Sequence, residues 1–230
     1  MAENTESKNE DNTTSDPFYL NAKKYWANVT PTVDGMLGGF AKISPTDING
    51  SKAFLRPFLK ISGGSVSPNH ALDCGAGIGR VTKRLLLPIF ESVDMVEQDQ
   101  HFCDNAREFI GPDSSRVSNI FCTGLQSFTP AEKTYDLIWS QWVLGHLEDD
   151  DLITFFKKCQ KGLREGGVFI LKENILECGR KTLDDCDSSY TRTKEDMREC
   201  IRKAGLTILA EQKQKDFPKD LYPVYMFAVQ

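Results

Sequence analysis

Three glycines between a predicted strand and a predicted helix are the first feature of this chain that can do chemistry. The run Leu72-Asp-Cys-Gly-Ala-Gly-Ile-Gly-Arg80 places them at positions 75, 77 and 79. Glycines let the backbone turn sharply and let a ligand lie against it. A dinucleotide-binding pattern needs glycine at its sixth position, where this chain has Arg80. The spacing therefore disfavours a pyrophosphate-bearing cofactor, although a glycine-rich turn that binds nothing has the same pattern.

A carboxylate ends the next predicted strand. The alternating stretch 92–97 ends at Glu97, about twenty residues past the loop, where a carboxylate can accept both hydrogen bonds of a ribose diol. An acidic strand end can also serve only to keep a strand tip soluble. Together with Asp73 before the glycines, the pattern resembles the first motif of the seven-strand methyltransferases that use S-adenosylmethionine.

Further candidates follow the fourth and fifth predicted strands. They are the segment Gln141-Trp-Val-Leu-Gly-His146, Asn174, and the segment Leu183-Asp-Asp-Cys-Asp-Ser-Ser189 with three carboxylates in four residues. Carboxylates at that density repel one another unless they are solvated or face a cation. A solvated acidic loop, a structural histidine and core tryptophans remain open as alternatives.

Composition excludes several classes of protein. The chain has 230 residues, 40% hydrophobic content and a net charge of -5 without a long basic run, so no nucleic-acid-binding footprint is present. Seven cysteines without a Cys-x-x-Cys pair predict neither a zinc site nor a disulfide framework, and we expect no metal. The N-terminus lacks an apolar core, and no run of about 18 apolar residues occurs, so we expect neither secretion nor a membrane span.

The elements that must position these residues alternate between strand and helix from His70 onward. The predicted strands are 70–74, 92–97, 117–122, 135–140, 167–173, 206–211 and 222–229, and the predicted helices are 78–88, 99–110, 149–163 and 193–204. The last two strands have no helix between them, which predicts a closing hairpin with an antiparallel final strand. The expected fold is α/β, a seven-strand doubly wound Rossmann-like sheet that collects its ligand residues at the carboxyl edge.

The N-terminal part is expected to differ from the sheet region. Residues 1–16 are polar and predicted to be disordered. An amphipathic helix with an aromatic face is expected over 17–29, a packed glycine-containing loop over 32–40, and a short helix over 51–61. Residues 17–230 are thus predicted to form one domain with a helical extension, 17–65, at its N-terminus.

Four segments identify a family resemblance. Thr32-Val-Asp-Gly-Met-Leu-Gly-Gly39, Ala71–Arg80, Gln141–His146 and Leu183–Ser189 resemble the protein alpha-N-terminal methyltransferases, over about residues 17–230. That family transfers methyl groups from S-adenosylmethionine to the free α-amine of proteins that begin, after Met removal, with X-Pro-Lys or X-Pro-Arg. The resemblance implies an enzyme of the nucleus and cytoplasm with protein substrates and no nucleic-acid or membrane partner. It also implies that segment 17–65 covers the substrate channel.

The resemblance also assigns roles to residues. The implied cofactor-binding residues are Gly75, Gly77, Arg80, Glu97, Gln98, Leu125, Gln126 and Gln141. The implied substrate-binding residues are Trp26, Leu37, Ile43, Trp142, Asp184, Ser189 and Tyr222, and the implied catalytic residues are Asp187, His146 and Asn174. A second-position proline suits the indole of Trp142, and a basic third residue suits Asp184 and Asp187.

Methyl transfer needs an amine with a free lone pair. An α-amine has a reference pKa near 8, so a nearby acceptor favours the reactive form. Asp187 and His146 are the candidate acceptors, and solvent is the alternative. Two other functions stay open on sequence alone, namely a small-molecule methyltransferase of the same fold and a non-catalytic subunit that binds the cofactor.

Overall fold

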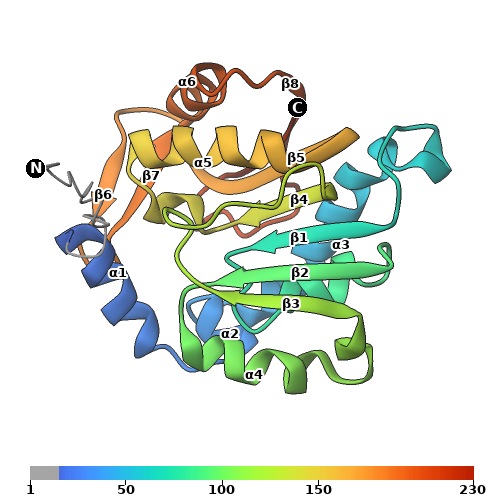
Figure 1. The fold of residues 1–230 in the computed structure, drawn as a ribbon. Coiled ribbons are helices and arrows are strands. Elements are labelled where there is room, and N and C mark those ends of the chain that lie inside the picture. Colours follow the sequence, from blue (N-terminus) through green and yellow to red (C-terminus); the bar gives the residue numbers. More distant parts are fainter. Residues whose placement is uncertain (1–15) are drawn as a thin grey trace, which may run out of the picture.

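A mixed β-sheet with helices on both faces forms the centre of the molecule (Figure 1). The computed structural model describes residues 16–230, so the predicted disordered tail lies outside the described residues except for Asp16. The central strands are β1 (His70–Cys74), β2 (Ser92–Glu97), β3 (Val117–Cys122), β4 (Tyr135–Gln141), β5 (Leu163–Leu176), β8 (Ile208–Lys213) and β9 (Val224–Val229). The predicted α/β fold of doubly wound type is confirmed.

Strand pairing follows from the connections. The order β3-β2-β1-β4-β5 is parallel throughout, as expected where helical or other crossovers join the strands. A connection without a helix joins β8 to β9, and these two strands pair antiparallel. Strand β9 also runs antiparallel to β5, from Phe169↔Val229 to Asn174↔Val224. The predicted antiparallel final strand is therefore confirmed.

The helices match the prediction in part. The structure has α1 (Pro17–Ala27), α2 (Val33–Met36), α3 (Ser44–Leu55), α4 (Gln100–Ile110), α5 (Asp149–Gly162) and α6 (Lys194–Lys203). It also has the 3₁₀- or π-helical segments η2 (Ala41–Ile43), η3 (Arg56–Phe58), η4 (Lys60–Ser62), η5 (Thr82–Leu86), η6 (Gly111–Arg116) and η7 (Leu144–His146). Within residues 16–230, no helix is long and apolar enough to cross a membrane.

Two predicted helices were wrong in extent. The helix expected over 51–61 begins at Ser44, because Pro45 suits a first helical turn, and Pro57 then interrupts its continuation. The helix expected over 78–88 is reduced to the π-type turn η5.

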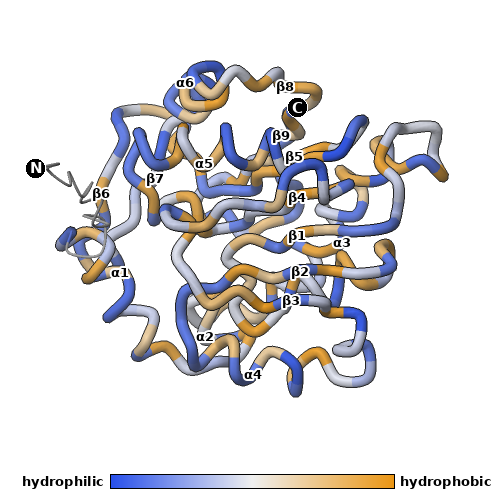
Figure 2. Tube along the Cα trace, in the orientation of Figure 1, coloured by the Kyte–Doolittle hydropathy of each residue, from blue (hydrophilic) through white to orange (hydrophobic). Residues whose placement is uncertain are grey.

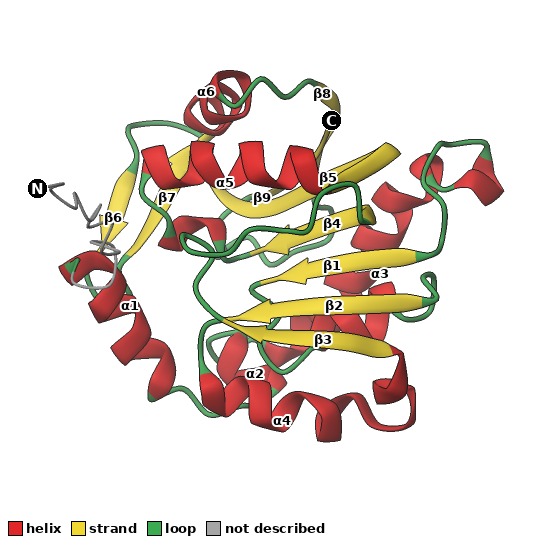
Figure 3. Ribbon diagram, viewed as in Figure 1, coloured by secondary structure: helices red, strands yellow, loops and turns green. Residues whose placement is uncertain are grey.

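Residues 182–193, where no strand was predicted, form a β-hairpin after β5 (Figure 3). Strand β6 (Thr182–Asp184) pairs antiparallel with β7 (Ser189–Thr193), and β7 pairs with the last residues of β5. Strand β5 runs four residues past its pairing with β4, and its last two residues pair with β7. The hairpin raises the number of strands from the predicted seven to nine.

Two hydrophobic clusters fix the sheet, one on each face. Along β5, Phe169 and Leu171 belong to the cluster under α5 and α6, whereas Val168 and Ile170 belong to the cluster over α3 and α4. The alternation follows from the two-residue period of a strand. Figure 2 shows the result as largely hydrophobic colouring along β1 and β2 and hydrophilic colouring on the outer α6.

Helix α1 lies beyond the carboxyl ends of the parallel strands, beside the β6–β7 hairpin (Figure 1). Its N-cap Asp16 accepts a hydrogen bond from the Phe18 amide. The Phe18 ring stacks on Tyr190 of β7 with centroids 5.3 Å apart, and the Tyr19 hydroxyl donates to Asp151 at the start of α5. These contacts place the aromatic face of α1 over the edge of the sheet where the candidate residues gather.

Candidate active site

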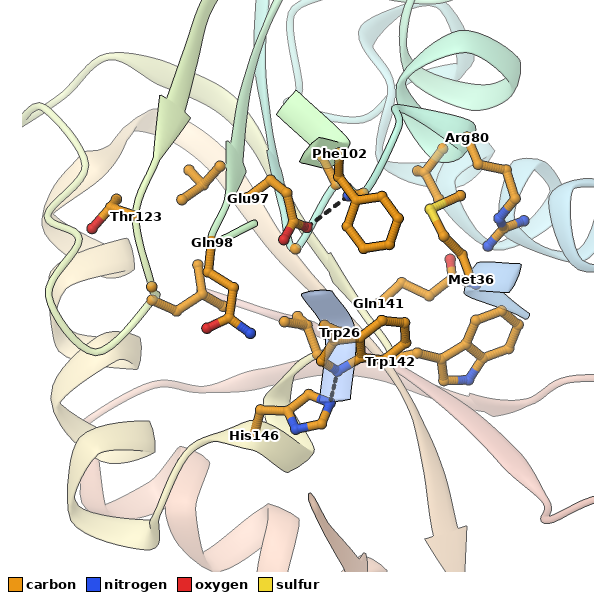
Figure 4. Close-up of a pocket in the computed structure, with 18 of the residues that line it drawn as sticks. Trp26, Met36, Arg80, Glu97, Gln98, Phe102, Thr123, Gln141, Trp142 and His146 are labelled. Atoms are coloured by element: carbon orange, nitrogen blue, oxygen red, sulfur yellow. Dashed lines mark hydrogen bonds between the residues drawn. The ribbon is translucent and has the colours of Figure 1, made fainter. Parts of the chain in front are cut away.

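One cavity at the carboxyl ends of β1, β2 and β4 brings the predicted cofactor residues together (Figure 4). Its lining includes all eight of them, Gly75, Gly77, Arg80, Glu97, Gln98, Leu125, Gln126 and Gln141. In Figure 4, Arg80, Met36 and Trp142 lie at one end, and Gln98 and Thr123 lie at the other.

The glycine loop forms one wall of this cavity, and a larger residue would not fit at Gly75 or Gly77. Gly75 has a φ of 71° and Gly77 a φ of 56°, in the left-handed region. A Cβ atom on Gly75 would lie 2.5 Å from the side chain of Val143, and one on Gly77 would overlap the Met36 sulfur. The backbone therefore borders the cavity directly.

Glu97 supplies a carboxylate to the cavity. Its Oε2 accepts from the Gly77 amide at 2.9 Å, and its Oε1 accepts from the Asp99 amide at 3.0 Å. Burial raises the pKa of Glu97, and the surrounding backbone amides oppose that rise. The arrangement fixes the acceptor oxygens of Glu97 at the loop.

Arg80 and Gln141 are joined by a residue that the sequence analysis missed. The Arg80 Nη1 donates to Asp47 Oδ2 at 2.6 Å, and the Gln141 Nε2 donates to Asp47 Oδ1 at 2.8 Å. Asp47 lies in the first turn of α3, where an acidic residue usually interacts with the helix dipole in solvent. Its burial depends on α3 packing against the sheet, and no sequence signal indicates that contact.

These residues fit S-adenosylmethionine. The glycine loop lets a ligand approach the backbone, Glu97 offers acceptors for a ribose diol, and Arg80 offers a cation for the carboxylate of the methionine moiety. Leu125 and Gln126 also line the cavity and suit the adenine. No group of three or more potential metal-binding side chains occurs among residues 16–230.

A second cavity adjoins the first. Trp26, Met36, Leu37, Trp142 and His146 line both. The second cavity contains nine of the predicted substrate and catalytic residues, namely Trp26, Leu37, Ile43, Trp142, His146, Asn174, Asp187, Ser189 and Tyr222.

Asp184 is the one predicted substrate residue that does not line this cavity. It is exposed at the end of β6, and its Oδ1 accepts from the Cys186 amide at 2.9 Å. Asp187 lines the cavity from within the turn between the strands, and the next residue, Ser188, has a left-handed φ of 52°. The hairpin thus separates two carboxylates that look alike in the sequence.

Asp187 has an unusual oxygen. Its Oδ1 is buried and has no hydrogen-bond partner among residues 16–230. A buried carboxylate oxygen without a partner is unfavourable, so it favours a donor or a cation brought by a ligand.

His146 differs because both of its ring nitrogens are engaged. Trp26 Nε1 donates to His146 Nε2 at 3.0 Å, and His146 Nδ1 lies 3.1 Å from the Ser188 carbonyl oxygen. The pair of contacts assigns the hydrogen to Nδ1. Burial lowers the pKa of His146, and the charge of Asp187 opposes that effect. The ring therefore links α1 to the hairpin in its neutral form.

Glu173 is a second residue that the sequence analysis missed. It lines the second cavity, and its Oε1 accepts from the amides of Val143 at 2.9 Å and Leu144 at 2.8 Å. Burial raises the pKa of Glu173 to about 7, although these amides oppose the rise. A charged residue directly before Asn174 at a strand end was the available signal.

Trp142 forms the wall between the cavities. Its φ of 55° is left-handed, and its amide donates to the Lys172 carbonyl at 3.0 Å. Phe217 faces its ring with centroids 6.4 Å apart, and the Arg80 guanidinium lies 5.4 Å from the ring centroid. The indole Nε1 has no partner within the described part of the chain. The backbone strain at this position thus aims an indole at both cavities.

Comparison with known proteins gives a consistent result. The family model described as AdoMet (S-adenosylmethionine) dependent proline di-methyltransferase matches residues 14–230. The chain is 50% identical over 213 residues to N-terminal Xaa-Pro-Lys N-methyltransferase 1 of Xenopus tropicalis, covering 92% of this chain and 95% of the relative. It is 49% identical over 212 residues to the human protein of that name, with the same coverage.

The solved structures agree. A SAM-dependent methyltransferase from Leishmania major superimposes with a TM-score of 0.86 at 34% identity, covering 93% of this chain and 83% of that one. The glycine loop, the two adjoining cavities and these matches along nearly the whole chain show that this protein belongs to the family of S-adenosylmethionine-dependent proline dimethyltransferases.

Proposed function

We propose that this protein transfers methyl groups from S-adenosylmethionine to the free α-amino group of proteins that start, after Met removal, with X-Pro-Lys or X-Pro-Arg. The observation that carries the proposal is the junction of the two cavities. The cofactor cavity adjoins, across Trp26 and Trp142, a second cavity that contains the unpartnered oxygen of Asp187. The names of the relatives at about half identity support the same acceptor.

The first residue of the acceptor is proposed to lie between Asn174 and Asp187. S-adenosylmethionine supplies the methyl group when it is bound. An α-amine, with a reference pKa near 8, arrives largely protonated at neutral pH. The free Asp187 Oδ1 is suited to accept a hydrogen bond from it and to take its proton. His146 is suited to hold Trp26 and the Ser188 carbonyl in place, because both of its nitrogens are already engaged.

The second and third residues of the acceptor are proposed to contact different groups. A proline ring packs against Trp142 next to Phe217, and both of these aromatic residues line the second cavity. A basic third residue is attracted by the carboxylates of the β6–β7 hairpin, with Asp187 inside the cavity and Asp184 exposed outside it. In this arrangement Asp184 attracts the basic third residue from a distance and does not form a direct ion pair with it.

A single assay tests the proposal. The protein is incubated with methyl-labelled S-adenosylmethionine and a peptide beginning Ser-Pro-Lys-Arg, in parallel with the N-acetylated copy of that peptide. We expect label on the free peptide alone, because acetylation removes the nucleophilic lone pair of the amine. Equal labelling of the acetylated copy would show that a side chain is the acceptor and would sink the proposal. A Ser-Ala-Lys-Arg peptide is the matched control for the proline, and we expect it to be labelled more slowly.

We also propose that the protein acts in the nucleus and cytoplasm and needs no nucleic-acid or membrane partner. The family resemblance supports this location. Fractionation of cells that express the tagged full chain tests it, and exclusive recovery in a membrane fraction would contradict it.

A further inference from the structure

A buried charge cluster lies directly behind the cofactor cavity. The Asp47 carboxylate contacts Arg80 Nη1 at 2.6 Å through Oδ2 and Lys172 Nζ at 2.6 Å through Oδ1. Gln141 Nε2 donates to the same Oδ1 at 2.8 Å. Asp47 and Lys172 are fully buried, and Arg80 is 4% exposed. One carboxylate therefore serves two buried cations.

The surroundings of Lys172 favour its charged form. Its Nζ donates to the Asp47 carbonyl at 3.1 Å, to Ser51 Oγ at 3.0 Å and to Gln214 Oε1 at 2.7 Å. The Asp47 carboxylate and carbonyl and the Gln214 amide oxygen only accept, and an ammonium has three hydrogens to give them. Burial lowers the pKa of Lys172 and would raise that of Asp47, but their contact opposes both effects, and the pKa of Asp47 is lowered as a result.

Arg80 keeps part of its guanidinium for the cavity. It lines the cavity, and in the described part of the chain no hydrogen bond joins its Nε or Nη2 to a protein group. Another carboxylate near Arg80, Asp73, does not contact it and instead accepts from the amide and hydroxyl of Thr82. Because Asp47 divides its charge between Lys172 and Arg80, it neutralises Arg80 only in part.

We propose that Lys172 is a positioning residue that shares Asp47 with Arg80 and thereby keeps the Arg80 guanidinium available for the carboxylate of the methionine moiety of the cofactor. Without the ammonium, Asp47 becomes a full ion-pair partner of Arg80 and competes with that carboxylate. The inference rests on the cofactor role of Arg80 and is independent of the acceptor, so it is tested by binding in the absence of peptide.

The test compares two ligands by isothermal titration calorimetry. One is S-adenosylhomocysteine, and the other is its decarboxylated form, which lacks only the carboxylate. We expect the wild-type protein to prefer the carboxylate form at least about tenfold, as for a hydrogen bond to a charged group. In Lys172→Met the preference falls toward parity, while affinity for the decarboxylated ligand is kept. The double variant Asp47→Asn/Lys172→Met regains the preference, because Arg80 loses its competing anion.

A matched control separates charge from packing. Ser51→Ala removes one hydrogen bond from the same ammonium without changing any charge, so its ligand preference stays at the wild-type value. A purely structural role for Lys172 predicts that the double variant binds no better than the single one, and that outcome overturns the proposal. If Lys172→Met does not fold, Asp47→Asn is decisive, because it keeps both cations and is expected to prefer the carboxylate at least as strongly as wild type. A lost preference in that variant overturns the proposal.

Failure of this proposal differs visibly from failure of the proposed function. A wild-type protein without any carboxylate preference removes the role of Arg80, and the Lys172 proposal with it, while methyl transfer to the free peptide is unaffected. A protein that labels the acetylated peptide refutes the acceptor and leaves the calorimetric result standing.

Discussion

At the scale of single residues, one carboxylate oxygen distinguishes Asp187 from its neighbours. Asp184 and Asp187 look equivalent in the sequence, but only Asp187 lines the second cavity, where its Oδ1 is buried without a partner among residues 16–230. His146 has no comparable free atom, since Trp26 and Ser188 occupy its ring nitrogens. Asp187 is therefore the stronger candidate for the group that accepts the proton of the amine.

Replacing this carboxylate tests its role. Asp187→Asn keeps the shape of the side chain but removes its charge and basicity, so we expect the turnover number to fall by roughly a hundredfold or more. The affinity for S-adenosylhomocysteine should stay the same, because Asp187 does not line the cofactor cavity. Steady-state kinetics and calorimetry measure the two quantities.

The matched control is Asp184→Asn, the same change at an exposed position three residues earlier. We expect its turnover number to stay within about twofold of wild type, because a proton acceptor must lie within hydrogen-bond reach of the amine. Equal losses of turnover in both variants would mean that the total negative charge of the hairpin, and not proton acceptance by Asp187, supports turnover.

At the scale of elements, Glu173 connects β5 to the segment after β4. The Glu173 Oε1 accepts hydrogen bonds from the amides of Val143 and Leu144. These two residues directly follow Trp142, whose φ is left-handed. A non-glycine residue in this conformation persists only when its surroundings determine it. The strand end of β5 thus holds the indole of Trp142 between the two cavities.

Glu173 also predicts a pH dependence of stability. Its pKa is about 7 in the folded protein, against a reference value of 4.5. Between those values the unfolded chain has lost the proton and the folded protein retains it, so the free energy of unfolding falls as pH rises. The effect amounts to about 3 kcal/mol and is complete above the folded pKa.

Glu173→Gln keeps an acceptor oxygen for both amides and has no proton to lose. Its free energy of unfolding, measured by urea denaturation, should therefore gain about 2.5 kcal/mol on wild type between about pH 5 and pH 8. Taking the difference between the two proteins cancels the other titrating groups they share. A constant difference over this range would show that Glu173 does not titrate there.

At the scale of the whole molecule, the site is enclosed by parts from both ends of the chain. The sheet edge carries the cofactor residues, α1 and the glycine segment through Leu37 cover them, and the hairpin and the loop with Phe217 complete the second cavity. Figure 1 shows α1 lying beside β6 and β7 although they are far apart in sequence. The acidic β6–β7 hairpin borders the second cavity, and the protein as a whole has a net charge of -5.

This charge distribution predicts a salt effect on substrate capture. We expect KM for a Ser-Pro-Lys-Arg peptide to rise as salt increases from ~0.05 to ~0.5 M, because exposed charges are screened over a shorter distance. A Ser-Pro-Gln-Gln peptide is the matched control, and its KM should change much less. The same salt response for both peptides would contradict long-range attraction by the hairpin.

The sequence by itself determined the fold and the cofactor, since both depend on local patterns. Strands and helices follow from the periodicity of apolar residues, and a glycine loop before a helix works through its own backbone, so 75–79 and Glu97 were identifiable in one dimension. The hairpin at 182–193 was not, because it depends on pairing between β7 and the last two residues of β5, a contact between separate segments that no local pattern shows.

Only the tertiary structure decided which polar residues are buried together. Asp47, Lys172 and Glu173 look like ordinary charged residues, and their burial depends on contacts between elements far apart in the chain. The same holds for Asp187 against Asp184, since a turn of a few residues places one inside the cavity and the other outside. Burial sets the energetics of charge in a protein, and burial is a property of the packed molecule rather than of the sequence pattern.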